Sequence, residues 1–142
     1  MSYGARYDFS NNTLIEAPPI APFLHPLRLR IADWAGIAAE SFSHAIVTEY
    51  RAGTPLGWHR DIHHFETVVG VSLASPARMR LRRYPPQRGD RAATNLELEP
   101  RSIYSMQAAA RWDWQHAISP THALRYSITF RTLRGARGES SG

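Results

Sequence analysis

The stretch Arg125-Tyr126-Ser127-Ile128-Thr129-Phe130-Arg131 alternates polar and apolar side chains along its whole length. Successive side chains of a β-strand point to opposite faces, so this run predicts a strand with one polar and one apolar face. The apolar face must pack into a core. The polar face, which has an arginine at each end, either meets water, as most arginines do, or lines a polar cavity.

Short β-rich runs separated by turn-forming residues make up most of the chain from residue 45 onward. They cover residues 45–50, 67–73, 78–84, 95–98, 102–106, 111–117 and 125–133. Upstream, apolar residues recur every three or four positions from Leu27 to Ala38, which predicts one amphipathic helix between Pro26 and Glu40 with Pro26 in its first turn. The segment before the helix, residues 1–23, is rich in turn formers and is expected to wrap the domain as extended chain and loop. The sequence therefore predicts a mainly β core with one N-terminal supporting helix.

The composition is ordinary for one globular domain, with 142 residues of which 43% are hydrophobic. We expect this domain to span residues 1–134, followed by a disordered tail at 135–142. The lack of cysteine excludes disulfides and thiolate catalysis. The formal net charge of +5 comes from arginine alone and permits a polyanionic partner without requiring one. Because no membrane span or signal peptide is visible, we expect a cytoplasmic monomer that does not bind membranes.

A possible metal site begins with His59 and Asp61, which are two residues apart and would point to the same side of an extended backbone. His116, far along the chain, can supply a third ligand from another strand. Two imidazoles and one carboxylate on one face of an octahedron are the ligands of the non-haem Fe(II) oxygenases. His63 and His64 follow closely, but we expect them to be exposed or to lie behind the ligands, because three ligands already complete the set.

Several segments stand in a characteristic order around these residues. They are Ile46-Val47-Thr48-Glu49-Tyr50-Arg51-Ala52-Gly53, His59-Arg60-Asp61, Val69-Gly70-Val71-Ser72-Leu73, Trp114-Gln115-His116-Ala117-Ile118 and Arg125-Tyr126-x-x-Thr129-Phe130-Arg131. Over roughly residues 3 to 131, their order and spacing resemble the AlkB family of 2-oxoglutarate- and Fe(II)-dependent dioxygenases. The final arginine motif is the most specific part, because the iron ligands alone are shared by the whole oxygenase superfamily.

This resemblance implies a double-stranded β-helix (jelly-roll, cupin-like) and a role for each motif residue. It implies that His59, Asp61 and His116 bind Fe(II). It also implies that Arg125, helped by Tyr50, binds the distal carboxylate of 2-oxoglutarate, and that Arg131 lies near the metal-bound end of this co-substrate. A planar guanidinium suits a carboxylate, which it can bind with two hydrogen bonds. Two further co-substrate contacts are expected where the family often has asparagine, and here these positions hold shorter hydroxyl side chains, Thr48 and Ser127.

The implied reaction uses O2 to decarboxylate 2-oxoglutarate to succinate and CO2 and to oxidise a nearby C–H bond. In AlkB-like enzymes this bond is typically in an N-methyl group of a DNA or RNA base, and the product loses formaldehyde. Two alternatives remain open on the sequence. One is a hydroxylase of a protein or small molecule on the same core, and the other is a catalytically idle β-barrel binding module.

The substrate-binding half is less complete in this sequence. In the family, a nucleotide-recognition lid precedes the motif that Tyr3-Gly4-Ala5-Arg6-Tyr7 resembles, and here the chain begins at that motif, so most of the lid is expected to be missing. Tyr3 and Tyr7 could stack on a base or, at least as readily, pack the N-terminal arm onto the barrel.

A run of arginines offers a second possible contact to nucleic acid. Arg78, Arg80 and Arg82 share one strand face and could bind phosphates, but an antiparallel hairpin would set Glu97 and Glu99 opposite them, and we favour the hairpin. For the tryptophans near these motifs we expect packing rather than substrate contact; they are Trp58, Trp112 and Trp114.

Overall fold

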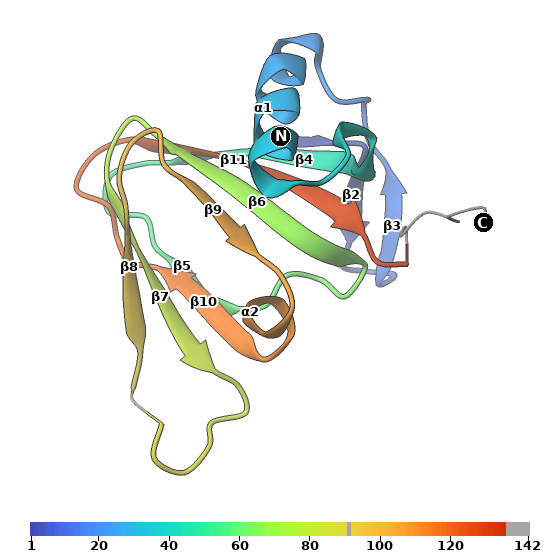
Figure 1. The fold of residues 1–142 in the computed structure, drawn as a ribbon. Coiled ribbons are helices and arrows are strands. Elements are labelled where there is room, and N and C mark those ends of the chain that lie inside the picture. Colours follow the sequence, from blue (N-terminus) through green and yellow to red (C-terminus); the bar gives the residue numbers. More distant parts are fainter. Residues whose placement is uncertain (91, 136–142) are drawn as a thin grey trace.

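The computed structural model describes residues 1–90 and 92–135. The chain folds into two facing antiparallel sheets, a double-stranded β-helix (Figure 1). The larger sheet has the strand order β1-β4-β11-β6-β9 and the smaller one β5-β10-β7-β8, while β2 and β3 form a separate hairpin. The strands are β1 (Ser2–Tyr3), β2 (Ala5–Asp8), β3 (Thr13–Glu16), β4 (Phe42–Tyr50), β5 (Leu56–His59), β6 (Phe65–Leu73), β7 (Ala77–Arg83), β8 (Thr94–Leu98), β9 (Ile103–Met106), β10 (Trp114–Ile118) and β11 (Arg125–Leu133). The predicted mainly β fold with one main helix is confirmed.

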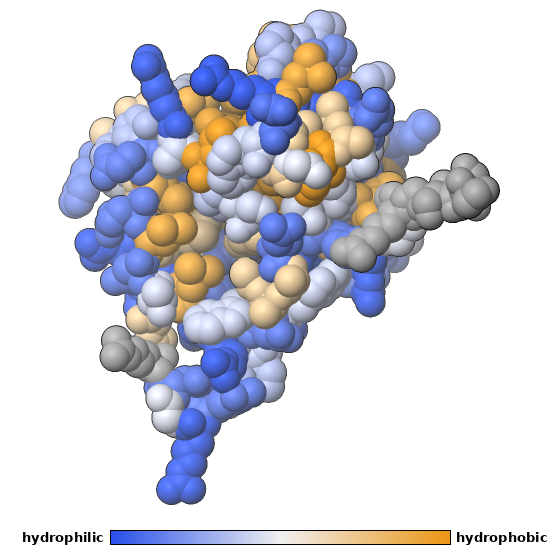
Figure 2. All heavy atoms as spheres, in the orientation of Figure 1, coloured by the Kyte–Doolittle hydropathy of each residue, from blue (hydrophilic) through white to orange (hydrophobic). Residues whose placement is uncertain are grey.

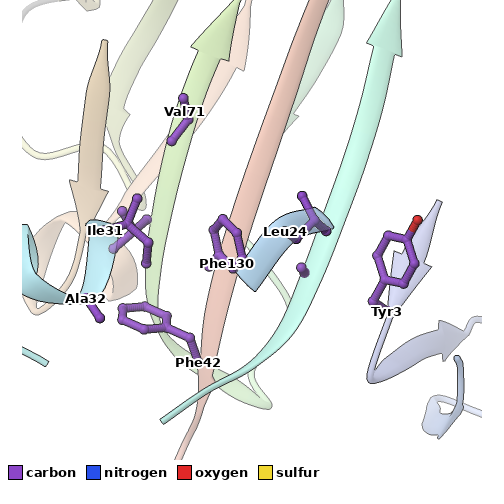
Figure 3. Close-up of a cluster of buried hydrophobic side chains, with 9 residues drawn as sticks. Tyr3, Leu24, Ile31, Ala32, Phe42, Val71 and Phe130 are labelled. Carbon is purple, nitrogen blue, oxygen red and sulfur yellow. The ribbon is translucent and has the colours of Figure 1, made fainter. Parts of the chain in front are cut away.

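The main helix, α1 (His25–Ala35), covers the outer face of the larger sheet (Figure 1). It follows a 3₁₀ turn, η1 (Pro22–Leu24), and Pro26 lies in its first turn as predicted. Figure 3 shows the resulting core, in which side chains of the helical segment meet those of the strands: Leu24, Ile31 and Ala32 against Phe42, Val71 and Phe130. The apolar face of β11 therefore packs under the helix.

The helix is shorter than predicted. It ends at Ala35 because Gly36 adopts the left-handed conformation (φ 68°) that commonly terminates helices, and a 3₁₀ turn, η2 (Ala39–Ser41), follows. Trp34, one of the regularly spaced apolar residues between Leu27 and Ala38, is 53% exposed. Ala38 lies outside the helix. The apolar periodicity continued beyond the capping glycine, whereas the helix did not.

Two further boundaries differ from the predictions. The N-terminal segment is not only loop, because β1 pairs with β4 and β2 pairs with β3. The predicted strand at 111–117 begins later, since Ala109–Trp112 form a short helix, α2, before β10. Both differences arise from long-range contacts: β1 uses a free strand edge, and the side chain of Arg111 is buried against another strand.

The sheet register directs the polar face of β11 inward. β11 lies between β4 and β6, with Arg125 opposite Tyr50 and Ser127 opposite both Thr48 and Ser72. The arginine face thus lines an interior cavity and is not a solvated outer surface. Residues 84–90, which follow β7, project from the body at the bottom of Figure 1, and Figure 2 shows mainly hydrophilic residues there.

Two expectations concern parts of the molecule beyond this core. Of the predicted tail at 135–142, residues 136–142 lie outside the described residues. Within the described chain, every helix is too short or too polar to cross a bilayer.

Candidate metal centre and adjoining cavities

Three predicted ligands converge at one end of the interior. His59 ends β5, Asp61 follows it, and His116 lies directly opposite His59 on β10. One ligand atom from each residue lies within 4.8 Å of the other two, and among the described residues this is the group able to hold a metal ion. Asp61 Oδ1 is 3.7 Å from His59 Nε2 and 3.6 Å from His116 Nε2. Two imidazole nitrogens and one carboxylate oxygen, converging in this way, fit an Fe(II) ion.

Arg131 holds the second oxygen of the Asp61 carboxylate. Its Nε and Nη2 both lie 3.0 Å from Asp61 Oδ2, and its Nη1 donates to Thr129 Oγ1 at 2.7 Å. Burial alone would raise the pKa of Asp61, but Arg131 and the two histidines outweigh it, so this pKa lies below its ordinary value. The carboxylate is therefore charged and leaves Oδ1 free to face a metal.

The two histidines present ring nitrogens to the centre. Burial, with the neighbouring His59, lowers the pKa of His116 to about 4, so its imidazole is unprotonated near pH 7. His59 Nδ1 lies 2.8 Å from the Gly57 carbonyl oxygen, a contact that directs Nε2 toward the centre. His63 is exposed and its ring lies against that of His64, and the converging group of ligand atoms consists of His59, Asp61 and His116.

A cavity of about 210 Å³ leads from the ligands to Arg125. Arg125 is 1% exposed, its Nε donates to Ser72 Oγ at 3.0 Å, and its Nη2 is buried without a hydrogen-bond partner among the described residues. The Tyr50 ring centroid lies 5.0 Å from its guanidinium carbon. A buried guanidinium with an unsatisfied donor is costly unless an anion binds to it. All five predicted co-substrate residues line this cavity: Thr48, Tyr50, Arg125, Ser127 and Arg131.

A second cavity, of about 520 Å³, adjoins the first one at the metal ligands His59 and Asp61. Its walls include Tyr7 and Phe9 from the N-terminal segment, and it shares His59, Asp61 and Arg131 with the first cavity. Tyr7 meets Phe9 edge to face, with 4.8 Å between ring centroids. Arg6 and Arg60 also line the second cavity. Tyr3, in contrast, is a core residue.

The arginine run on β7 forms the favoured hairpin with β8, but with fewer ion pairs than expected. Arg78 lies opposite Glu97 and its Nε contacts Glu97 Oε1 at 2.6 Å. Glu99 lies beyond the end of β8, so Arg80 faces Asn95 instead.

The tryptophans near the site stack against arginines. Trp58 lies under Arg80 and Arg82, at 5.3 and 4.3 Å between guanidinium carbon and ring centroid. Trp112 and Trp114 make similar contacts. As expected, these three tryptophans pack against neighbouring side chains.

Two residues of the site escaped the sequence analysis. Arg111, 3% exposed, donates to the carbonyl oxygens of Phe65 and Ile62 and so anchors the loop that follows Asp61. Tyr104 lines the cavity of Arg125. The only available signal for Tyr104 was strand alternation at 102–106, whereas Arg111 depends on the unexpected helix α2.

Fold and site together define a class, the 2-oxoglutarate- and Fe(II)-dependent dioxygenases. The profile of the 2OG-Fe(II) oxygenase superfamily matches residues 2–131, so the chain belongs to this superfamily. Within this superfamily, the chain is similar to an AlkB-type protein. It is 30% identical over 161 residues to the alkylated DNA repair protein ALKBH8 homolog of Arabidopsis thaliana. This match covers 93% of the present chain and 46% of the plant protein. The chain thus spans about half the length of this relative.

The fold has a counterpart among solved structures. The structure of OsALKBH1 superimposes with a TM-score of 0.73 at 15% sequence identity, over 93% of this chain and 76% of that one. This similarity supports the double-stranded β-helix and extends over almost the entire chain.

Proposed function

We propose that this dioxygenase domain oxidatively demethylates N-alkylated bases of DNA or RNA. The observation that carries the proposal is that two of the three candidate metal ligands, His59 and Asp61, line two different cavities at once. One has charged side chains in its walls and ends at a buried arginine, and the other has three tyrosine or phenylalanine rings and three arginines in its walls. The first suits a small dicarboxylate. The second suits a flat base attached to phosphates, because aromatic rings stack on bases and arginines attract phosphates.

In this proposal, His59, Asp61 and His116 hold Fe(II). When bound, the metal and 2-oxoglutarate supply the oxidation of the substrate C–H bond by O2. Arg125 and Tyr50 hold the distal carboxylate of the co-substrate, and Thr48 and Ser127 offer hydroxyl groups along its length. Arg131 restrains Asp61 so that one carboxylate oxygen faces the metal. The protein side chains orient the reactants and exclude water, and none is required as a general acid or base.

The test is demethylation of a single-stranded oligonucleotide carrying one N-methylated base. We expect formaldehyde and succinate to be released in equal amounts by the wild type with Fe(II). His59→Ala should abolish both products. Tyr7→Ala should reduce demethylation about tenfold through loss of base stacking, while turnover of 2-oxoglutarate without substrate continues.

Trp34→Ala removes an exposed ring on α1, outside both cavities, and is expected to leave demethylation unchanged. Succinate formation without formaldehyde from any methylated DNA or RNA would overturn the nucleic-acid substrate. Absence of 2-oxoglutarate turnover by the wild type would overturn the dioxygenase assignment for this chain.

A further inference from the structure

Gly70 and Tyr104 are paired across the interior face of the larger sheet. They lie directly opposite each other on β6 and β9, the strands at one edge of this sheet (Figure 1). A Cβ atom added to Gly70 would lie 2.2 Å from Cζ and 2.4 Å from the hydroxyl oxygen of Tyr104. The Tyr104 ring therefore lies across the Gly70 backbone, in space that any other residue at position 70 would fill. Because Gly70 has no side chain, the large side chain of Tyr104 fits over it.

The Tyr104 side chain reaches the cavity between its two charged ends. Gly70 lies opposite Thr129 on its other side, so one row across the sheet runs from Thr129 through Gly70 to Tyr104. On β11, Arg131 is two residues from Thr129 in one direction, and Arg125 is four residues away in the other. Burial raises the pKa of Tyr104 to about 12, although Arg125 and Arg131 oppose this shift. At neutral pH the phenol is thus a hydrogen-bond donor inside the cavity.

The distal end of the cavity lacks a full set of partners for an anion. Arg125 donates one hydrogen bond to Ser72 and keeps Nη2 unpartnered. A carboxylate has two oxygens with about four acceptor positions, more than one guanidinium edge can occupy. Strand β9 pairs with β6, the strand that carries Ser72. It contributes Tyr104 and Met106 to this cavity and no charged side chain.

We propose that Tyr104 is a specificity-determining residue for the co-substrate. Its hydroxyl donates a hydrogen bond to the distal carboxylate beside Arg125, and its ring, seated on Gly70, limits the length of the diacid that fits. The five-carbon 2-oxoglutarate is thereby accepted and the six-carbon 2-oxoadipate excluded. This inference rests on 2-oxoglutarate as co-substrate, but it does not depend on the identity of the primary substrate.

The experiment is calorimetric titration of the Mn(II)-loaded protein with 2-oxoglutarate and with 2-oxoadipate, which requires no turnover. Tyr104→Phe keeps the ring and removes the hydroxyl, so we expect 2-oxoglutarate to bind about tenfold more weakly. Tyr104→Leu shortens the side chain, and we expect the affinity for 2-oxoadipate relative to 2-oxoglutarate to rise about tenfold. Tyr126→Phe is the matched control, because Tyr126 lies on the opposite face of the same sheet.

Gly70→Ala tests the seat of the ring. The added methyl group should displace Tyr104 and weaken 2-oxoglutarate binding, and adding Tyr104→Phe should then cause little further loss. Unchanged affinity in Tyr104→Phe together with an unchanged preference in Tyr104→Leu would overturn the inference while leaving the dioxygenase assignment intact. A wild type that binds no 2-oxoglutarate would overturn both. If the wild type binds 2-oxoglutarate well but methylated bases poorly, only the proposed nucleic-acid substrate is contradicted.

Discussion

Arg131 shows how one residue can serve two neighbours at a metal site. Its guanidinium binds the oxygen of Asp61 that does not face the two histidines, and it also bonds Thr129. Both Arg131 and Asp61 are largely buried, with side chains 12% and 8% exposed. Removing one partner of such a pair leaves the other charge without compensation, which costs far more than the loss of an exposed pair.

We therefore expect Arg131→Gln to destabilise the metal-free protein by about 3 kcal/mol, because the Asp61 carboxylate stays buried without its guanidinium. The same change at Arg78 breaks the exposed pair with Glu97 and should cost less than about 1 kcal/mol. Urea unfolding of both variants with a chelator present measures the difference. Equal losses would show that burial does not govern these two ion pairs.

At the scale of elements, the helical segment η1–α1 and the sheet beneath it depend on each other. The helix has few buried residues of its own, namely Ile31 and Ala32, and the preceding turn adds Leu24. These side chains cover the apolar face of β11, whose opposite face forms the co-substrate cavity (Figure 3). Packing on one face of this strand thus holds the functional residues of the other face in register.

Leu24→Ala should destabilise the protein by about 3 kcal/mol, because it leaves a void under the helix where Leu24 is 1% exposed. Leu29→Ala makes the identical change on the same segment at a side chain that is 63% exposed, and we expect less than about 0.5 kcal/mol. Denaturant unfolding monitored by circular dichroism compares them. A similar cost at both positions would contradict the assigned packing of this segment.

At the scale of the whole molecule, buried histidines couple stability to pH. Burial, with the nearby Arg131, lowers the pKa of His44, and burial lowers that of His116 to about 4. Below the ordinary value of 6.5, the unfolded chain binds protons that the folded one does not. The part of the folding stability that these two buried histidines contribute above about pH 6.5 is consequently lost as the pH falls toward 4.

For the metal-free protein we expect the free energy of unfolding to fall below pH 6.5 by up to about 1.4 kcal/mol per pH unit for each of these histidines. His44→Gln should make this decline shallower, whereas His122→Gln, at an exposed position, should not. Urea titrations between pH 7.5 and pH 5 give the slope. If the free energy of unfolding of His44→Gln falls with pH as steeply as that of the wild type, His44 does not contribute to the pH dependence.

The sequence alone determined most of the strands from residue 45 onward and the polar residues that they carry. Alternation along residues 125–131 and the spacing of His59 and Asp61 depend on neighbouring residues, and periodicity reports such local order directly. The mainly β core and the supporting helix could be predicted on this basis. The resemblance that these motifs support also led to the candidate metal ligands, which converge in the structure, and to five residues that line one cavity.

Only the tertiary structure decided which face of β11 is enclosed. The alternation predicted two faces, but the register with β4 and β6 turned the arginines toward a cavity. It also decided the pairing of Gly70 with Tyr104 and the burial of Arg111, which join residues distant in sequence. The physical reason is the same in each case. Burial and cross-strand contact depend on which distant segments of the chain pack together, and a local sequence pattern does not specify those segments.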